Sequence, residues 1–367
     1  MTIINNIEID SNTIYYKPNT IKETIVNNEP IEDKLHVIIV VSNPCLYARR
    51  YILAKEFIKR IDLEETNILL YVVEFAYGNQ KFIMTDSNNK KHLQVRVDKP
   101  IWHKENMINC GVKALLPNTW KAFAWIDADI EFESTTWALD TLKVLNGCKD
   151  IVQLFSHAID MDKPKKTMAV FSSFGYQYCN QKQYGGTGLE YWHPGYAWAC
   201  TRKAYEKMNG LYEFGILGSS DNIMALSLIG RGIKAIDAKS TDGYKKTVLE
   251  YQNNVKNLRL GYIPGVIKHH FHGSKKNRKY TERWQILVKH LYDPLIHLEK
   301  NTSDNKNIDN KNIDNKNIDN KNIDNKNIDN KNNKFHVLIP SSLCPKELIS
   351  DIYHYFEERN EDEGYLE

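Results

Sequence analysis

Two aspartates separated by one small residue directly follow an apolar run near the middle of the chain. Residues 122–131 read Ala-Phe-Ala-Trp-Ile-Asp-Ala-Asp-Ile-Glu, so Asp127 and Asp129 stand at or just beyond the end of that run. A short apolar run of this kind is typical of a strand buried on both faces. Residues two apart in extended backbone share a face, so the carboxylates are expected to converge, with a cation between them. Such oxygen ligands suit Mg²⁺ or Mn²⁺, although a plain acidic turn is the alternative interpretation.

Three histidines stand within four residues at the end of a second apolar stretch. The segment 268–273 reads Lys-His-His-Phe-His-Gly and contains His269, His270 and His272. Any one of them could bring an imidazole to the carboxylates and complete a metal site, or all could be structural. Basic side chains follow at Lys275, Lys276, Arg278 and Lys279, which would either neutralise a diphosphate or form a solvated face.

Polar residues at the starts of loops and helices give further candidates for nucleotide binding. Asn43 follows the β-branched run 35–41, at the edge where ligands bind in open α/β sheets, or is simply a turn residue. Lys104 and Asn106 lie in the opening turn of an expected helix just before the acidic strand, where they could hold a nucleotide or its phosphates. Ordinary helix-start chemistry is the alternative for both residues.

An aromatic segment around a Pro-Gly turn is a candidate sugar-binding surface. Residues 191–199 read Tyr-Trp-His-Pro-Gly-Tyr-Ala-Trp-Ala, so Trp192 could stack on a sugar and Gly195 could admit a ligand close to the backbone. A packed corner of the core is the alternative. Asp221 precedes the apolar helix 223–229 and is either a catalytic base or a helix cap.

The elements that must position these residues alternate between strand and helix patterns. Strand 35–41, helix 51–61 and strand 68–74 form a βαβ unit, which predicts a parallel sheet in an α/β fold. Residues 157–190 are expected to be a long irregular insertion serving as a substrate lid. The other expected strands are 93–97 and 150–155, and the other expected helices are 102–116, 137–145 and 202–208.

Composition excludes several classes of protein. The 49 basic and 46 acidic residues leave a net charge of only +3, which argues against a nucleic-acid partner. No signal peptide is visible at the start, and no apolar run reaches the roughly 18 residues of a membrane span. Six widely spaced cysteines without a Cys-x-x-Cys pair are expected to be reduced core thiols. We therefore expect a cytoplasmic protein, and the Asn-, Lys- and Ile-rich composition suits an AT-rich genome, such as that of a virus acting in its host's cytoplasm.

Four regions are expected along the chain. Residues 1–33 read as a polar arm, and residues 34–300 as the main domain. Residues 301–334 are dominated by an Asn-Lys-Asn-Ile-Asp repeat, which is too poor in large apolar groups to order itself and predicts a disordered linker. Residues 335–367 form a small tail with room for one strand, 335–339, and one helix, 347–356.

The order of these motifs resembles that of glycosyltransferases with the GT-A fold. Residues 102–131 resemble their donor half, in which a Lys/Arg-x-Asn helix start precedes a strand ending in Asp-x-Asp. Residues 195–221 resemble the acceptor half of galactosyl- and N-acetylgalactosaminyltransferase-like proteins. The segments Trp-Ile-Asp-Ala-Asp, Tyr-Trp-His-Pro-Gly and His-x-x-His-Gly also resemble a set of bacterial glycosyltransferase-like proteins. The resemblance covers about residues 35–290.

The resemblance implies a Rossmann-like fold with a mostly parallel central sheet and helices on both faces. It implies that Asp129 ligates Mn²⁺ or Mg²⁺, that Asp127 faces the ribose or the metal, and that His272, or else His269, is the late metal ligand. Lys104 and Asn106 would hold the nucleotide. The turn Gly218-Ser219-Ser220-Asp221 lacks the family's usual glutamate, which leaves open whether the anomeric configuration is inverted or retained.

These expectations predict a metal-dependent transfer of a sugar from a nucleotide-sugar, UDP-linked by expectation, to a hydroxyl of a glycan or protein. Asp221 is the expected base. A sugar nucleotidyltransferase is one alternative, although the loop Ser42-Asn43-Pro44-Cys45 lacks the glycine-rich, basic character of such enzymes. A non-catalytic carbohydrate-binding protein is the other, and it would need the aromatic residues but not the aspartates.

Overall fold

The structure is a computed structural model that describes residues 2–4, 7–9, 29–64, 67–186, 191–303 and 334–363. Residues 304–333, which make up almost all of the expected repeat linker, lie outside the described residues. Most of the expected N-terminal arm, residues 1–33, also lies outside them. The described start of the arm is a short antiparallel pair, β1 (Thr2–Ile4) and β2 (Ile7–Ile9).

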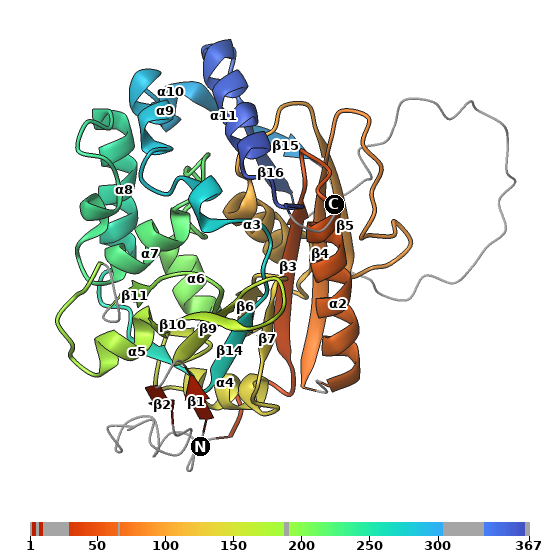
Figure 1. The fold of residues 1–367 in the computed structure, drawn as a ribbon, viewed down its shortest axis with the longest axis vertical. Helices are drawn as coiled ribbons and strands as arrows, with labels where there is room; N and C mark the ends of the chain where they lie inside the picture. Colours follow the sequence, from red (N-terminus) through yellow and green to blue (C-terminus); the bar gives the residue numbers. More distant parts are fainter. Residues whose placement is uncertain are drawn as a thin grey trace, which may run out of the picture.

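A seven-stranded sheet forms the centre of the molecule (Figure 1). Its order is β13-β8-β12-β6-β3-β4-β5, and only β12 runs against its neighbours. The predicted α/β fold with a mostly parallel sheet is therefore confirmed. The strands are β3 (Leu35–Ser42), β4 (Ile68–Tyr77), β5 (His92–Val97), β6 (Ala122–Ile126), β8 (Ile151–Gln153), β12 (Ala197–Thr201) and β13 (Leu260–Tyr262).

Alternation along the central strands builds a separate apolar core on each face of the sheet. In β3, Val37 and Ile39 pack into one core while Ile38 packs into the other. The first core also holds α2 (Ala48–Glu64) and α4 (Trp137–Leu145). The second holds α3 (Lys104–Leu115), α6 (Arg202–Met208), α7 (Ser220–Leu228) and α8 (Asp242–Val255). Helices thus cover both faces, as predicted.

A smaller five-stranded sheet, ordered β11-β10-β9-β14-β7, lies beside the end of β6. Residues 157–190 were expected to be irregular, and this expectation is wrong for most of the segment. It contains β9 (His157–Met161), β10 (Thr167–Ser173) and α5 (Phe174–Cys179), because pairing with strands distant in sequence stabilises segments whose own pattern is weak. The remaining strands are β7 (Ile130–Phe132), β11 (Trp192–His193) and β14 (Val266–His269).

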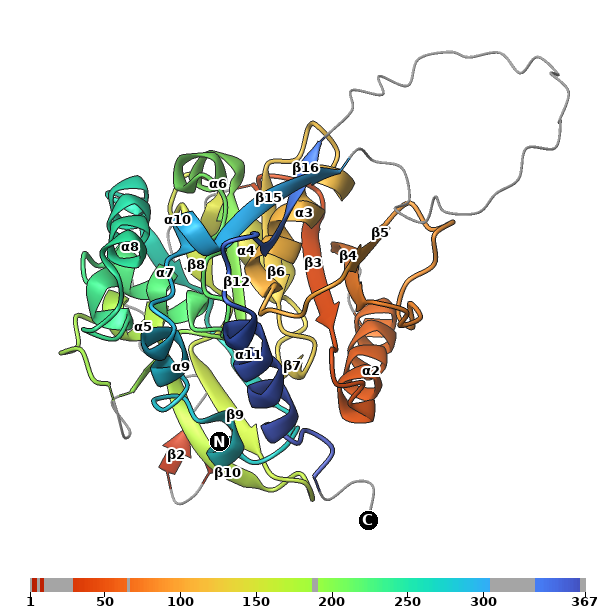
Figure 2. The ribbon, with the colours of Figure 1, turned by 90° about the horizontal axis from the view of Figure 1, so that it is seen from above.

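The C-terminal segment packs against the main body instead of standing apart from it. Strand β16 (Phe335–Pro340) pairs antiparallel with β15 (Leu298–Ser303) and lies beside α3, and α11 (Lys346–Glu358) follows (Figures 1 and 2). Two short helices, α9 (Trp284–Lys289) and α10 (Pro294–His297), precede β15. The predicted strand and helix of the tail are both present.

Cys110 and Cys200 are buried, as expected of core thiols, whereas Cys45, Cys148, Cys179 and Cys344 are only partly buried. Within the described parts of the chain, every helix is too short or too polar to cross a membrane.

Candidate active site

One cavity of about 530 Å³ opens at the carboxyl ends of β3 and β6. A volume of this size accommodates a small-molecule ligand. The acidic turn after β6, the aromatic turn after β11 and the start of α7 all contribute side chains to its wall. Residues of the C-terminal segment, Phe356, Arg359 and Glu361, also line it. The edge of the sheet that the sequence predicted as the ligand site is therefore the edge where this cavity lies.

Pairing between β7 and β14 brings the acidic turn and the histidines together. The two strands run antiparallel with His269 opposite Ile130, and the His270 N–H donates to the Asp129 carbonyl at 2.8 Å. Asp129 Oδ2 lies 2.9 Å from His272 Nε2 and 3.6 Å from His269 Nε2. The two Nε2 atoms are 3.3 Å apart. Strand pairing thus gathers three possible metal ligands from positions about 140 residues apart in the chain.

The third histidine of the cluster faces away from this point. His270 Nε2 lies 3.4 Å from Glu131 Oε2, on the opposite side of the strand from His269. Because β14 ends at His269, the strand alternation that would have grouped His270 with His272 does not extend that far. The structure therefore groups His269 and His272 with Asp129 and separates His270 from them.

Charge in the cluster is balanced between the carboxylate and the imidazoles. Burial opposes ionisation of Asp129, but His269 and His272 hold its pKa well below the usual range. Burial likewise opposes a charged imidazole at His269, but Asp129 and Asp160 raise the pKa of His269 to about 9. A cation that bound here would take over the role of these protons, since metal ligands are deprotonated.

The donor atoms of the cluster fit a divalent ion. Asp129 Oδ1 is buried, and no described residue supplies it with a hydrogen-bond partner. A buried carboxylate oxygen without a partner is costly unless it meets a ligand. One carboxylate and two imidazoles are a mixed oxygen and nitrogen set, which suits a first-row transition ion better than Mg²⁺, whose preference is for oxygen.

Asp127 stands apart from the cluster. It forms an ion pair with Lys104 at the first turn of α3, and both side chains line the cavity. Burial raises the pKa of Asp127, and Lys104 offsets part of that rise. The cluster of possible metal ligands consists of Asp129, His269 and His272, so the geometry gives no support to the prediction that Asp127 shares the metal. Asp127 does lie on the cavity wall, and its role toward the ribose stays a prediction.

Asn43, Gly195 and Asp221 all line the cavity, as expected of site residues. The Asn43 side chain is occupied within its own turn, donating to the Tyr47 carbonyl at 2.8 Å and accepting from the Tyr47 N–H at 2.9 Å. A Cβ at Gly195 would lie 3.0 Å from Asp221 Oδ2, so glycine lets this turn approach the carboxylate. Asp221 lies in the first turn of α7, where the helix dipole stabilises its charge.

Two predicted ligand residues, Asn106 and Trp192, lie outside the lining of this cavity, which corrects both predictions. The Asn106 amide holds the C-terminal strand: it donates to the His336 carbonyl at 3.2 Å and accepts from the Leu338 N–H at 3.0 Å. Trp192 packs edge-on against Phe174 and Tyr184 in the core. Both side chains were predicted to bind a ligand because of their residue types, but in the structure they make contacts within the protein.

Two arginines, Arg278 and Arg283, add positive charge to the cavity wall. Arg278 points its guanidinium at His272 Nε2 at 2.8 Å, and Arg283 contacts the hydroxyls of Ser219 and Tyr355. Neither has a salt bridge to a carboxylate within the described part of the chain. Arg278 belongs to the basic run that the sequence suggested for a diphosphate, while Lys279 of the same run pairs with Glu358 instead.

Sequence reasoning missed two buried carboxylates around the histidines. Asp160 Oδ1 lies 2.6 Å from His269 Nδ1, and Glu361 Oε2 lies 3.6 Å from His272 Nδ1. Asp160 had one available signal, an acidic residue inside an otherwise apolar strand segment. Glu361 had none, because it stands in an acidic run near the chain end that reads as solvent-exposed.

Several solved structures resemble this chain at low sequence identity. A Drosophila beta1,4-galactosyltransferase 7 catalytic domain, solved with xylobiose, is 12% identical over 55% of this chain and 63% of its own, with a TM-score of 0.31. The mannosyltransferase PcManGT from Pyrobaculum calidifontis, solved with GDP-Man and Mn²⁺, is 13% identical over 72% of this chain and 65% of its own, with a TM-score of 0.35. Both of these similar structures are glycosyltransferases. They are of the type that the sequence resembles.

This chain spans less than two thirds of the length of each of these two structures. A protein from Bacillus anthracis named as a glucose-1-phosphate thymidylyltransferase is also similar, at 10% identity over 71% of this chain and 96% of its own, with a TM-score of 0.32. No protein-family model matches the chain, and no curated protein matches it in sequence.

Proposed function

We propose that the protein is a metal-dependent glycosyltransferase that moves a sugar from a UDP-linked donor to a hydroxyl of a glycan or protein. The observation that carries the proposal is the convergence of Asp129, His269 and His272 in a cavity that also holds Arg278 and Arg283, neither of which forms a salt bridge within the described part of the chain. A metal site beside two guanidinium groups suits a ligand that carries a diphosphate.

Several ionisable groups of the cavity have a role in this reaction. Asp129, His269 and His272 would hold the cation, which we infer to be Mn²⁺ because two of the three donors are imidazoles. When bound, the cation offsets the negative charge that develops on the departing diphosphate. Arg278 and Arg283 are placed to hydrogen-bond phosphate oxygens in the same region.

The acceptor side of the reaction needs a base and an apolar wall. The acceptor oxygen forms a bond to the anomeric carbon as the bond to the nucleoside diphosphate breaks, and its proton passes to a carboxylate, which we assign to Asp221. Aromatic side chains at Phe171, Tyr191 and Tyr280 line the cavity, where they would stack on sugar faces and exclude water.

The turn after β3 argues against a sugar nucleotidyltransferase. Residues 42–47 read Ser-Asn-Pro-Cys-Leu-Tyr and contain neither glycine nor a basic side chain, and Asn43 is committed to holding the turn. A triphosphate would therefore lack the basic, glycine-rich cradle that a nucleotidyl transfer requires after the first strand.

Binding of Mn²⁺ and of UDP tests the proposal in two steps. Titration of the purified protein with Mn²⁺, followed by the electron paramagnetic resonance signal of the free ion, should give saturable binding that Asp129→Asn weakens at least ~100-fold. His270→Gln is the matched control, since His270 faces Glu131, and it should bind as the unaltered chain does. UDP should then raise the melting temperature only when Mn²⁺ is present.

The products of turnover separate the competing functions. A panel of nucleotide-sugars should yield the nucleoside diphosphate, through transfer or slow hydrolysis, whereas a nucleotidyltransferase would release pyrophosphate from a nucleoside triphosphate. Mn²⁺ binding that is equal in the original chain and in Asp129→Asn would remove the metal site, and with it the proposed reaction.

A further inference from the structure

Both imidazoles of the metal cluster are turned the same way, each with a buried carboxylate behind it. The Nε2 atoms of His269 and His272 face Asp129 Oδ2, while the Nδ1 atoms face Asp160 and Glu361 respectively. A carboxylate beside Nδ1 keeps a proton on that nitrogen and leaves Nε2 free to coordinate. Each histidine therefore has a carboxylate on its Nδ1 side, at 2.6 Å for His269 and at 3.6 Å for His272, and the two carboxylates come from different parts of the chain.

Asp160 is fixed behind His269 by the second sheet. Strands β9 and β14 run parallel with Asp160 beside His269, and the Asp160 side chain is 0% exposed. The Tyr196 hydroxyl donates to Asp160 Oδ1 at 3.0 Å, and Lys275 pairs with its other oxygen. These contacts leave the carboxylate little freedom to move away from the imidazole.

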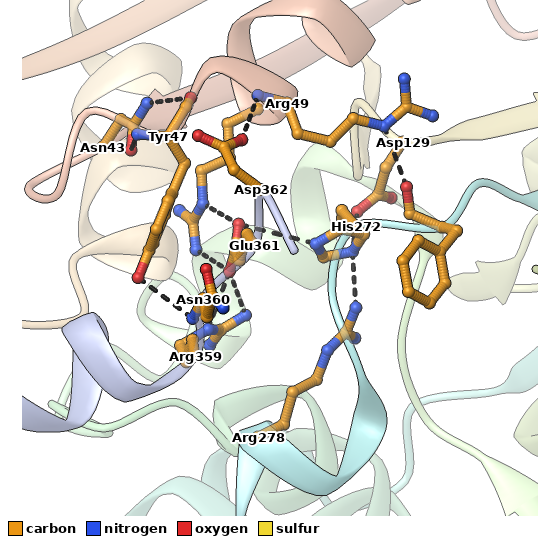
Figure 3. A network of polar contacts seen from close by, with 12 residues as sticks. Asn43, Tyr47, Arg49, Asp129, His272, Arg278, Arg359, Asn360, Glu361 and Asp362 are labelled. Carbon is orange, nitrogen blue, oxygen red and sulfur yellow. Dashed lines mark hydrogen bonds and ion pairs between the residues drawn. The ribbon is translucent and has the colours of Figure 1, made fainter. Parts of the chain in front are cut away.

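Glu361 is fixed behind His272 by the C-terminal segment. Its side chain is 1% exposed and lies between Arg50 of α2 and Arg359, with Arg50 Nη2 at 2.7 Å and Arg359 Nη2 at 2.8 Å (Figure 3). The two guanidinium groups thus hold the Glu361 carboxylate in place beside His272.

The backbone around Glu361 is tied to the turn that carries His272. Asp362 accepts from the Ala48 and Arg49 N–H groups at 2.9 and 2.7 Å, which anchors the segment to the start of α2 (Figure 3). Arg49 Nε in turn donates to the Phe271 carbonyl at 3.0 Å. A Cβ at Gly273 would lie 3.0 Å from both the Asn360 carbonyl oxygen and the Glu361 Cα, so only glycine allows the two segments to approach this closely.

We propose that Asp160 and Glu361 are positioning residues that orient His269 and His272 toward the metal, and that docking of the C-terminal segment therefore completes the metal centre. The inference rests on the proposed function, because it concerns the same site. It assigns to residues beyond the repeat region a part in the chemistry of the main domain. Glu361, among the last described residues, lies beside the proposed metal ligand His272, which is almost 90 residues earlier in the sequence.

The test compares Glu361→Gln with Asp362→Ala in the full-length protein. Both changes weaken the attachment of the C-terminal segment, but only the first removes the carboxylate behind His272. At matched thermal stability, Glu361→Gln should weaken Mn²⁺ binding about 10- to 100-fold, the usual effect of losing such a partner. Asp362→Ala keeps the Glu361 carboxylate and its partners Arg50 and Arg359, so it should lower the melting temperature and leave the Mn²⁺ dissociation constant within about threefold.

Asp160→Asn provides a second measurement that is independent of the C-terminal segment. It should weaken Mn²⁺ binding by a similar factor, and Glu361→Asp should recover part of the affinity that Glu361→Gln loses. If Glu361→Gln binds Mn²⁺ as the original chain does, the positioning role is wrong. If instead the affinity of both C-terminal variants falls in step with their stability, Glu361 serves only to attach the segment.

The same titrations distinguish this inference from the proposed function. Loss of binding in Asp129→Asn with unchanged binding in Asp160→Asn and Glu361→Gln would overturn the inference alone. A chain that binds no Mn²⁺ in any form would overturn the proposed function and the inference together.

Discussion

Lys104 and Asp127 form an ion pair that joins the first turn of α3 to the end of β6. The side chains are only 18% and 25% exposed, so water screens the pair weakly. Burial lowers the pKa of Lys104, but Asp127 and the neighbouring Glu105 raise it more, which keeps the ammonium charged. The pair neutralises one of several carboxylates that meet in the cavity, among them Asp129 and Asp221.

Removing Lys104 should therefore destabilise the protein by leaving a carboxylate without its partner. We expect Lys104→Met to lower the free energy of unfolding by ~1–3 kcal/mol, less than for a fully buried pair because both groups touch solvent. The double variant Lys104→Met, Asp127→Asn should recover at least half of that loss in urea unfolding. Strictly additive effects of the two changes would show that the pair contributes no coupling energy.

Asp221 is predicted to act on turnover and not on metal binding. Asp221→Asn should lower kcat about 10²- to 10⁴-fold, the range for loss of a general base, while Mn²⁺ affinity stays unchanged because Asp221 lies outside the ligand cluster. Asp242→Asn, which removes the same charge at the exposed start of α8, is the matched control. A kcat for Asp221→Asn within threefold of the original chain would exclude the assignment of the base.

Stability should fall in mild acid because of buried neutral histidines, of which His103 is the best defined. Burial lowers the pKa of His103 to about 4, and its Nε2 lies 2.9 Å from the Leu338 carbonyl of β16. Below a pH of about 6.5, His103 becomes protonated in the unfolded state, whereas in the folded state it stays neutral until the pH reaches about 4. The unfolded state therefore binds more protons in this window, so stability is lost as the pH falls from about 6.5 to about 4.

Urea unfolding across that window tests this expectation. His103→Gln keeps a side-chain donor for Leu338 but cannot titrate, so it should reduce the slope of stability against pH by up to ~1.4 kcal/mol per pH unit. The control is His354→Gln in α11, whose side chain is 70% exposed and should leave the slope unaltered. Equal slopes in the original chain and in His103→Gln would contradict the assignment.

The repeat region is predicted to be dispensable for folding of the described domain. Strands β15 and β16 pair with Ser303 opposite Phe335, so the two ends of the intervening chain are anchored side by side. Replacing residues 304–334 by a two-residue Asn-Gly turn should let the hairpin form and raise stability by ~2 kcal/mol, from the smaller entropy of closing a shorter loop. The melting temperature and the Mn²⁺ dissociation constant are the measurements. Failure of the shortened chain to fold would show that the repeat takes part in the packing of the domain.

Local patterns in the sequence were sufficient to predict elements whose stability is mostly local or uniformly apolar. Helix α4 has the bounds expected from its apolar stripe, 137–145, and β6 stands where the apolar run before Asp127 predicted it. The strands of residues 157–190 were missed because their sequences are mixed in polarity. These strands are stabilised by pairing with other strands, such as the pairing of β9 with β14, which is roughly 100 residues away in the sequence.

The sequence by itself determined the chemical types in the site and their approximate place: an acidic turn after a buried strand, a group of histidines, and an acid at a helix start. Only the tertiary structure decided which of them meet. The β7–β14 pairing selects His269 and His272 over His270, packing withdraws Asn106 and Trp192 from the cavity, and docking of the chain end brings in Glu361. Side-chain type and spacing are local properties of the sequence. The convergence of metal-binding side chains depends on strand pairing and packing between segments that lie far apart in the sequence.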